Sequence, residues 1–175
     1  MNAMKMKPRD LIIGLVVLGL VGLAGWLWLA PSGNAAPNVE MTLLDGKTVD
    51  LRELRGHPVL INFWATSCPG CVEEIPHLAK LYDRLSPQGF EIIGVAMSYD
   101  VPSQVRNMQQ DRHIPYPIAI DHTDAISKAF GTIRLTPTSF LIDPQGRVVY
   151  QKIGNVDVHK LAARIERMLK KQGNG

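Results

Sequence analysis

The sequence contains only two cysteines, Cys68 and Cys71, among its 175 residues. It has no internal repeat, no low-complexity segment, and no phosphate-binding loop, dinucleotide fingerprint or catalytic-triad motif. We therefore expect no cofactor other than a redox-active disulfide. Charge of one sign is not in excess either, because 16 basic residues stand against 15 acidic ones from residue 37 onward. This balance gives no reason to expect a nucleic-acid partner.

The longest stretch without a charged residue runs for 20 residues, from Leu11 to Ala30. A helix of that length can cross the hydrocarbon core of a bilayer. The basic residues shortly before it are Lys5, Lys7 and Arg9. Because basic flanks stay on the cytoplasmic side, residues 1–10 are predicted to be cytoplasmic and the remainder to face the periplasm or cell exterior. The sequence thus predicts a single-pass anchor at residues 11–30 in the inner (cytoplasmic) membrane.

A cleaved signal peptide is the alternative interpretation of residues 11–30. Ala35 and Ala36 are small residues near a candidate cleavage point. The apolar run, however, is longer than the about 7–15 residues that are usual in a signal peptide. We therefore favour the anchor.

After a linker at residues 31–38, residues 39–172 are predicted to form one domain with a complete core. A hairpin with an Asp-Gly turn is expected at residues 39–51, followed by a helical turn at 51–55. Apolar runs predict strands at residues 59–64, 90–98, 116–120, 139–142 and 147–153. Helical spacing of apolar residues predicts helices at residues 69–85, 103–112, 124–130 and 158–169. Pro76 lies inside one of these helices and is expected to kink it rather than break it.

The two cysteines lie where the strand at 59–64 ends and the helix at 69–85 begins, with the spacing C-x-x-C. Unsatisfied N–H groups and the partial positive charge of a helix N-terminus both favour a thiolate. Cysteines three residues apart on a helix are close enough to bond to each other. A disulfide that closes so small a loop stabilises a fold only slightly, so the spacing favours a redox or metal-binding role for the two cysteines. Two thiolates without a suitably spaced histidine pair fall short of a structural zinc site.

This spacing assigns different roles to the two cysteines. Cys68, at the helix start, is the candidate nucleophile that attacks a substrate disulfide to form a mixed disulfide. Cys71 then attacks Cys68 and releases the reduced substrate. Pro69 suits the first turn because an N–H there would lack an intrahelical partner.

The chain resembles a known family in four motifs: Asn62-Phe63-Trp64-Ala65, Cys68-Pro69-Gly70-Cys71, Glu74-Ile75-Pro76, and the run from Thr136 to Asp143. Across residues 37–172 it is similar to the extracytoplasmic thioredoxin-like proteins of the TlpA/ResA type. These are thiol–disulfide reductases, often tied to cytochrome c maturation. The resemblance implies a thioredoxin-like α/β fold: a central mixed sheet flanked by helices, with an added N-terminal hairpin and a short central insert around residues 100–127.

The resemblance also implies roles for residues around the cysteines. A glutamate at the position of Glu74 lies beside the cysteines and tunes their proton transfers, and the alternative here is a solvated residue that favours the helix. Pro137 is expected to form a cis peptide bond facing the disulfide, and the backbone of Thr136 to pair with an extended substrate segment. Trp64, Pro69 and Gly70 are expected to line the substrate cleft. The expected partners are protein disulfides, with apocytochrome c as a candidate, and a membrane thiol reductant as electron donor.

The sequence departs from cytoplasmic thioredoxins at several positions of these motifs. Asn62 stands where thioredoxins have an acidic proton acceptor, and Ser67 stands where they usually have tryptophan. The residues between the cysteines are Pro69-Gly70 rather than Gly-Pro. Because these two residues help to set the reduction potential, no potential is carried over from a relative.

Three other functions remain open at this point. A dithiol oxidase or isomerase uses the same fold, and proline directly after the first cysteine also occurs in strong oxidants. A peroxiredoxin-like peroxidase shares the hairpin, but it has Thr or Ser three residues before its reactive cysteine, where this chain has Ala65. A copper-handling module usually has three residues between its cysteines and a distant histidine ligand.

Overall fold

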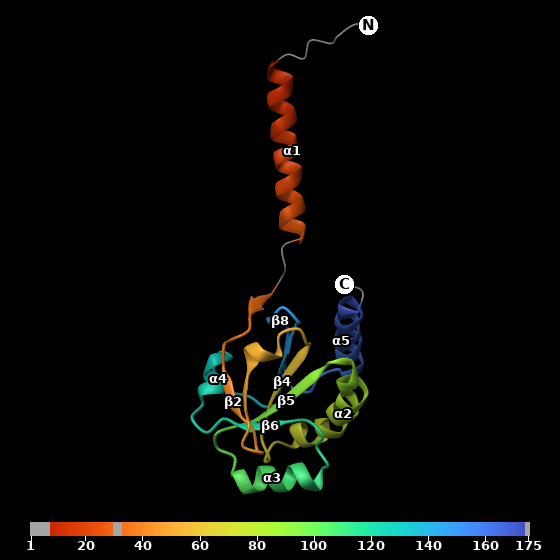
Figure 1. Ribbon diagram of the computed structural model, residues 1–175. Helices are drawn as coiled ribbons and strands as arrows, with labels where there is room; N and C mark the ends of the chain where they lie inside the picture. The colour runs from red at the N-terminus through yellow and green to blue at the C-terminus, as the bar shows by residue number, and fades with distance from the viewer. Residues whose placement is uncertain (1–7, 30–32, 174–175) are drawn as a thin grey trace. The chain divides into compact units, whose positions relative to one another are not determined.

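The computed structural model describes residues 8–29 and 33–173, which belong to two compact units that divide after Ser32 (Figure 1). The first unit contains one helix, α1 (Pro8–Leu29), close to the helix predicted at 11–30. In the part of the chain that the structure describes, no helix is long and apolar enough to cross a membrane. The predicted membrane span therefore stays a prediction. Residues 1–7 of the predicted cytoplasmic segment and residues 30–32 lie outside the described residues.

The second unit is built on a six-stranded mixed sheet with the strand order β1-β8-β7-β4-β5-β6. Its strands are β1 (Asn34–Ala35), β4 (Val59–Trp64), β5 (Glu91–Ala96), β6 (Ile118–Ile120), β7 (Thr138–Ile142) and β8 (Arg147–Ile153). β4 pairs in parallel with β5, and β5 with β6, whereas β7 is antiparallel to both β4 and β8. A separate hairpin joins β2 (Glu40–Thr42) to β3 (Thr48–Asp50), as the Asp-Gly turn predicted.

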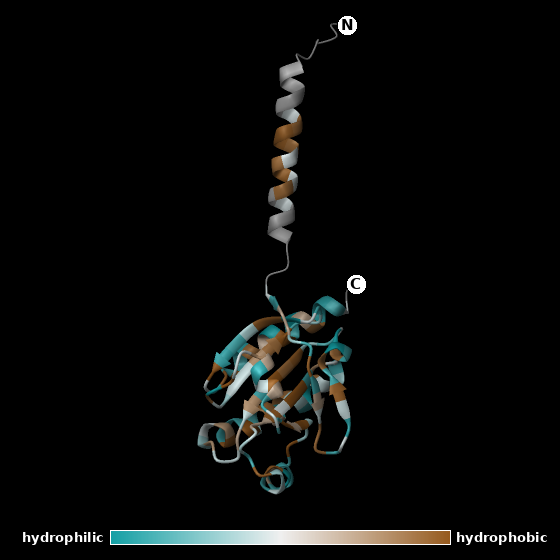
Figure 2. Ribbon diagram, turned by 90° about the vertical axis from the view of Figure 1, so that its left-hand side faces the viewer, coloured by the Kyte–Doolittle hydropathy of each residue, from teal (hydrophilic) through white to brown (hydrophobic). Residues whose placement is uncertain are grey.

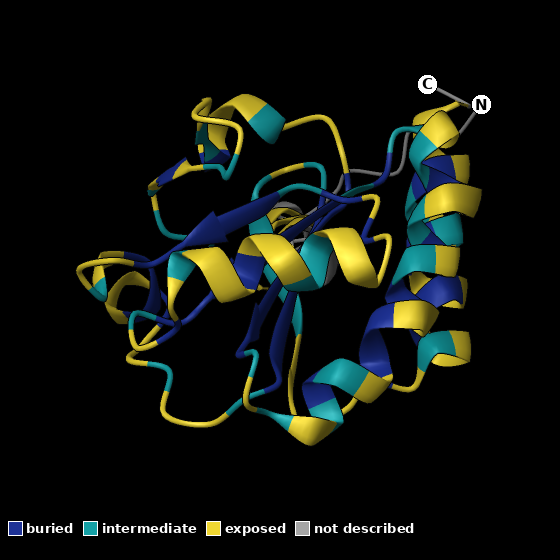
Figure 3. Ribbon diagram, turned by 90° about the horizontal axis from the view of Figure 1, so that it is seen from below, coloured by how far each residue is buried: buried dark blue, intermediate teal, exposed yellow. Residues whose placement is uncertain are grey.

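Helices cover both faces of this sheet. They are α2 (Pro69–Leu85), α3 (Pro102–Asp111), α4 (Ala125–Ala129) and α5 (Val158–Gln172), with the short 3-10 turns η1 (Leu51–Leu54) and η2 (Ser86–Gln88). α2 and α5 lie side by side (Figure 1). The central strands β4, β5, β6 and β7 are buried while the helices expose their outer faces (Figure 3), and these central strands are the most hydrophobic part of this unit (Figure 2). The arrangement is the thioredoxin-like α/β fold that the resemblance implied.

Strand β4 divides the core into two halves because successive side chains point to opposite faces of a sheet. Leu60 and Trp64 pack with α2, α3 and α5 on one face. Ile61 and Phe63 pack with the hairpin, η1 and α4 on the other. All six residues of β4 are buried, as expected for a central strand with a neighbour on each side.

The structure differs from the prediction at the start of this unit. Residues 31–38 were predicted to be a linker, yet Asn34 and Ala35 form strand β1 and pair with Val148 and Arg147 of β8. The pairing is made by the main chain. A strand of two residues is too short to show the alternation of apolar side chains from which a strand is predicted, so the sequence contains no signal for it. The folded unit therefore begins at Gly33 rather than at residue 39.

Candidate active site

The cysteine pair lies at the N-terminus of α2 and forms a disulfide, with the two Cα atoms 5.3 Å apart. Cys68 is the N-cap residue, and its Sγ accepts a hydrogen bond from the Cys71 N–H at 3.2 Å. Pro69 occupies the first turn, as predicted. Cys68 is half-buried, whereas Cys71 is only 2% exposed. One sulfur is thus within reach of a substrate and the other is shielded behind it.

The Thr136–Pro137 peptide bond is cis, which confirms the prediction for Pro137. The carbonyl oxygen of Thr136 lies 3.5 Å from Cys68 Sγ. In the disulfide this sulfur has no hydrogen to donate, so the approach is a contact; the reduced thiol can donate there. The Thr136 main chain is therefore directly beside the sulfur that would meet a substrate.

Glu74 lies one helical turn after Cys71 and is only 3% exposed, so the interpretation as a solvated residue is wrong. Its Oε1 accepts a hydrogen bond from the Val156 N–H at 2.6 Å, and its Oε2 accepts one from Asn62 Nδ2 at 3.2 Å. Asn62 Nδ2 also donates to Ser139 Oγ at 2.9 Å. Burial raises the pKa of Glu74 above its ordinary value, and the two hydrogen bonds oppose this only in part.

A short loop between β8 and α5 holds three parts of the site together. The Gly154 N–H donates to the Pro137 carbonyl at 2.8 Å. Asn155 Nδ2 donates to the carbonyl of Gly70, between the cysteines, at 3.2 Å. Val156 supplies the N–H that binds Glu74. The loop thereby links the cis-proline, the C-x-x-C turn and the buried carboxylate.

The residues expected to line the cleft have different positions. Pro69 is exposed and Gly70 and Thr136 are half-buried, while Pro137 is buried beneath them. Trp64 is only 3% exposed and belongs to the core under α2, so the prediction that it contacts substrate is wrong for this state. Strand alternation causes this, because it turns Trp64 to the same inner face as Leu60.

An open cavity of about 430 Å³ lies beside the residues that precede Cys68. Thr66 and Ser67 form one wall, and α3 with the residue after it forms the other, through Gln104, Asn107, Met108, Asp111 and Arg112. Among the described residues, no group of three or more His, Cys, Asp or Glu side chains is placed to hold a metal ion.

Comparison with known proteins agrees with this geometry. A family model described as Redoxin matches residues 31–168. The chain belongs to the redoxin family. It is 36% identical over 139 residues to the thiol-disulfide oxidoreductase ResA of Bacillus thuringiensis subsp. konkukian, which covers 79% of this chain and 77% of that relative. It is 39% identical over 129 residues to the ResA of Halalkalibacterium halodurans, covering 73% and 72% of the two chains.

A solved structure supports the same assignment for this redoxin. The thiol:disulfide interchange protein of Chlorobium tepidum superposes with a TM-score of 0.72 at 28% identity, covering 79% of this chain and 98% of that one. With the C-x-x-C pair at the start of α2, this redoxin is a ResA-like thiol–disulfide oxidoreductase.

Sequence reasoning missed two polar parts of the site, the loop at Asn155 and Val156 and the buried residue Asp100. Asp100 follows the carboxyl end of β5, next to the strand that leads into Cys68. The carboxyl ends of parallel strands are a common place for functional residues, so the position of Asp100 after a strand was a usable signal. Asn155 had no such signal, because its contact with Gly70 joins segments 85 residues apart.

Proposed function

We propose that this redoxin reduces protein disulfides, with Cys68 as the attacking thiolate and Cys71 as the resolving thiol. The observation that carries the proposal is the difference in burial between the two cysteines, Cys68 and Cys71, of one helix turn. Cys68 is half-buried and next to the Thr136 carbonyl, whereas Cys71 is 2% exposed. Only a sulfur that a protein substrate can reach is able to form the first mixed disulfide.

The proposed reaction passes two electrons from the protein dithiol to the substrate. The Cys68 thiolate attacks one substrate sulfur, the substrate disulfide breaks, and its other sulfur leaves as a thiolate that takes up a proton. Cys71 then loses its proton and attacks Cys68 Sγ, which releases the second substrate sulfur. The products are a substrate dithiol and the Cys68–Cys71 disulfide.

Glu74 is proposed to accept the proton of Cys71 in the second step. Its raised pKa brings a carboxylate closer to the range in which it can bind and release protons near neutral pH. Asn62, which stands where thioredoxins have an acidic group, hydrogen-bonds this carboxylate instead. Glu74 would thus take over a role for which Asn62 has no ionisable group.

The substrate is proposed to be an extended protein segment that pairs with the main chain at Thr136 beside the disulfide. The resemblance to ResA-type proteins makes apocytochrome c the first substrate to test and a membrane thiol reductant the first electron donor. We also propose that the domain works outside the cytoplasm at the inner membrane. The support for this location is the uncharged run at residues 11–30 with basic residues before it.

A trapping experiment tests the assignment. In a Cys71→Ser variant the mixed disulfide cannot be resolved, so a cysteine-containing substrate should stay covalently bound to Cys68. Cys68→Ser is the matched control and should trap nothing. Trapping through Cys71 in the control would reverse the two roles.

The reduction potential decides between a reductase and the alternative, a dithiol oxidase or isomerase. Equilibration with glutathione buffers should give a potential below about −220 mV if the protein is a reductase. A value near about −120 mV, typical of a strong oxidant, would favour the alternative.

A further inference from the structure

Three buried aspartates follow three strands of the sheet, and each holds the segment beside it. They are Asp100 after β5, Asp121 after β6 and Asp143 after β7, and all are at most 7% exposed. Asp121 accepts hydrogen bonds from the N–H groups of Ile126 and Ser127, and so caps α4. Asp143 binds the N–H groups of Gln145 and Arg147 within its own turn. Asp100 is the one of the three whose partner belongs to the redox site.

Asp100 binds Thr66, two residues before Cys68, through both of its oxygens. The Thr66 N–H donates to Oδ2 at 2.9 Å and to Oδ1 at 3.2 Å, and the Thr66 hydroxyl donates to Oδ1 at 2.7 Å. A buried carboxylate that receives several hydrogen bonds fixes its partner firmly, because separating them leaves a charge without solvent.

Thr66 is a central residue of the turn that carries Cys68. The Cys68 N–H donates to the Ala65 carbonyl at 3.2 Å, which closes the turn over residues 65–68. A second tie runs beside it, from the Met97 N–H to the Trp64 carbonyl at 3.1 Å. The loop at 97–100 thus holds the segment between β4 and Cys68 at two points.

We propose that Asp100 is a positioning residue for Cys68, which acts by holding the turn at Thr66. In the disulfide, the covalent bond to Cys71 already restrains Cys68. After reduction that bond is gone, and Asp100 supplies a restraint on the turn that presents the thiol. The dithiol is the state that reacts with a substrate disulfide. Asp100 therefore matters more for the position of Cys68 in the dithiol state than in the disulfide state.

The test uses the full-length chain with Asp100→Ala, Asp100→Asn and the control Asp121→Ala. Asn retains an acceptor for the Thr66 N–H and a donor for its hydroxyl, so it keeps the geometry without the charge. The measurements are the rate at which iodoacetamide alkylates Cys68 in the reduced protein and the reduction potential. Thermal unfolding of both redox states accompanies them.

We expect Asp100→Ala to change the alkylation rate of Cys68 about tenfold, because orientation of a reacting group is lost. Because the same bonds are present in the disulfide state, they hold the reduced turn in the arrangement that the disulfide requires, so their loss should disfavour the disulfide about tenfold and raise the potential by about 30 mV. Asp100→Asn should stay near the wild type. Asp121→Ala should lower thermal stability equally in both redox states and leave the alkylation rate and potential unchanged.

Two results would overturn the proposal. One is an Asp100→Ala variant whose alkylation rate and potential equal those of the wild type. The other is an Asp100→Asn variant that is altered as much as Asp100→Ala, because the negative charge and not the held turn would then be responsible. If Asp100→Ala does not fold, Thr66→Val removes only the hydroxyl bond and should give a smaller change in the same direction.

Discussion

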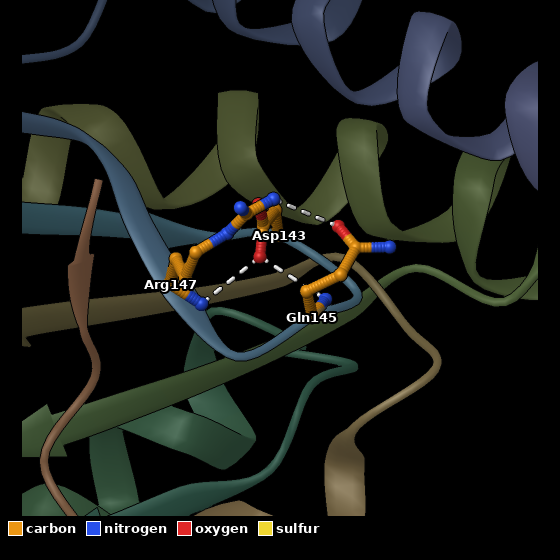
Figure 4. A network of polar contacts seen from close by, with 3 residues as sticks. All are labelled: Asp143, Gln145 and Arg147. Atoms are coloured by element: carbon orange, nitrogen blue, oxygen red, sulfur yellow. Dashed lines mark hydrogen bonds and ion pairs between the residues drawn. The ribbon is translucent and has the colours of Figure 1, made fainter. Parts of the chain in front are cut away.

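Two buried carboxylates of this redoxin have opposite surroundings. Asp143 lies in the turn between β7 and β8, where the guanidinium of Arg147 contacts it at 2.6 Å and two main-chain N–H groups donate to it (Figure 4). Glu74 lies behind the disulfide and is bound only by neutral donors, Asn62 and Val156. Among the ion pairs of the described residues, none includes Glu74.

These surroundings indicate a structural role for Asp143 and a role in the redox chemistry for Glu74. The Arg147 guanidinium and two main-chain N–H groups offset the cost of burying the Asp143 carboxylate, which therefore holds the turn. At Glu74 the two neutral donors offset only part of the cost of burying a carboxylate, and burial therefore raises the pKa of this group. Buried groups with such shifted pKa values are frequent at functional sites. Changes at the two carboxylates should therefore have different consequences.

The largest loss of stability is expected from Asp143→Ala. It leaves the Arg147 guanidinium and two turn N–H groups without their acceptor, which should cost about 2–3 kcal/mol of unfolding free energy. The titration of the cysteines in the folded variant should be unchanged. Urea unfolding and the thiolate absorbance at several pH values measure the two quantities. A shifted cysteine titration would mean that the two regions are coupled.

Glu74→Gln should have the reverse profile, with a smaller effect on stability and a clear effect on chemistry. Removing the carboxylate ends its repulsion of a nearby thiolate, so the cysteine titration should move to lower pH. Turnover should fall several-fold or change its pH profile, as general acid–base groups commonly contribute about a hundredfold or more. If the thiolate absorbance curves of variant and wild type superimpose, Glu74 takes no part in the chemistry.

The stability of the wild type should depend on pH through Glu74. Because its pKa is raised in the folded state, the folded protein binds more protons than the unfolded one just above the ordinary value of 4.5. The free energy of unfolding contributed by this group therefore falls as the pH rises from 4.5 through the raised value. Urea unfolding of wild type and Glu74→Gln across this range tests it. The stability difference should move in favour of Gln as the pH rises, and a constant difference would contradict the raised pKa.

The smallest effect is expected where Asn155 meets the C-x-x-C turn. A Cβ on Gly70 would lie 3.0 Å from Asn155 Oδ1, so Gly70→Ala forces this side chain to move. Alanine also favours the helix over glycine by about 0.5–1 kcal/mol, which opposes that cost. Gly70→Ala should therefore be more stabilising in an Asn155→Ala background than in the wild type. Equal effects in the two backgrounds would show that the contact contributes nothing.

Much of the fold could be predicted from the sequence because its main elements carry strong local patterns. The bounds of β4 and α2 agree with the prediction at 59–64 and 69–85, since an apolar run ends at a C-x-x-C turn and a helical pattern follows. Strand β1 could not be found in this way, because its two residues are held by main-chain pairing with β8.

The site was predicted less completely than the fold, for a physical reason. Cys68, Cys71 and Pro137 belong to motifs that are local in the sequence. The contacts of Asp100 with Thr66 and of Asn155 with Gly70 join residues 34 and 85 positions apart. Such contacts arise only when the sheet brings its strand ends together. Burial of Trp64 and Glu74 likewise depends on which helix covers the sheet.

Strand β1 at the start of the second unit also limits edge-to-edge pairing of this sheet with the sheet of another molecule. The two edge strands of the sheet are the short strand β1 and strand β6, so β8 would become an edge strand without β1, and an uncovered edge invites pairing between molecules. Asn34 and Ala35 occupy the beginning of β8, while Leu43 and Leu44 bridge to β6 through Ala119 and Ile118. A chain shortened to residue 37 would keep the cover on β6 and lose the cover on β8. We therefore expect residues 33–36 to reduce aggregation through β8. A fragment of this redoxin that begins at Gly33 should aggregate less than one that begins at residue 37.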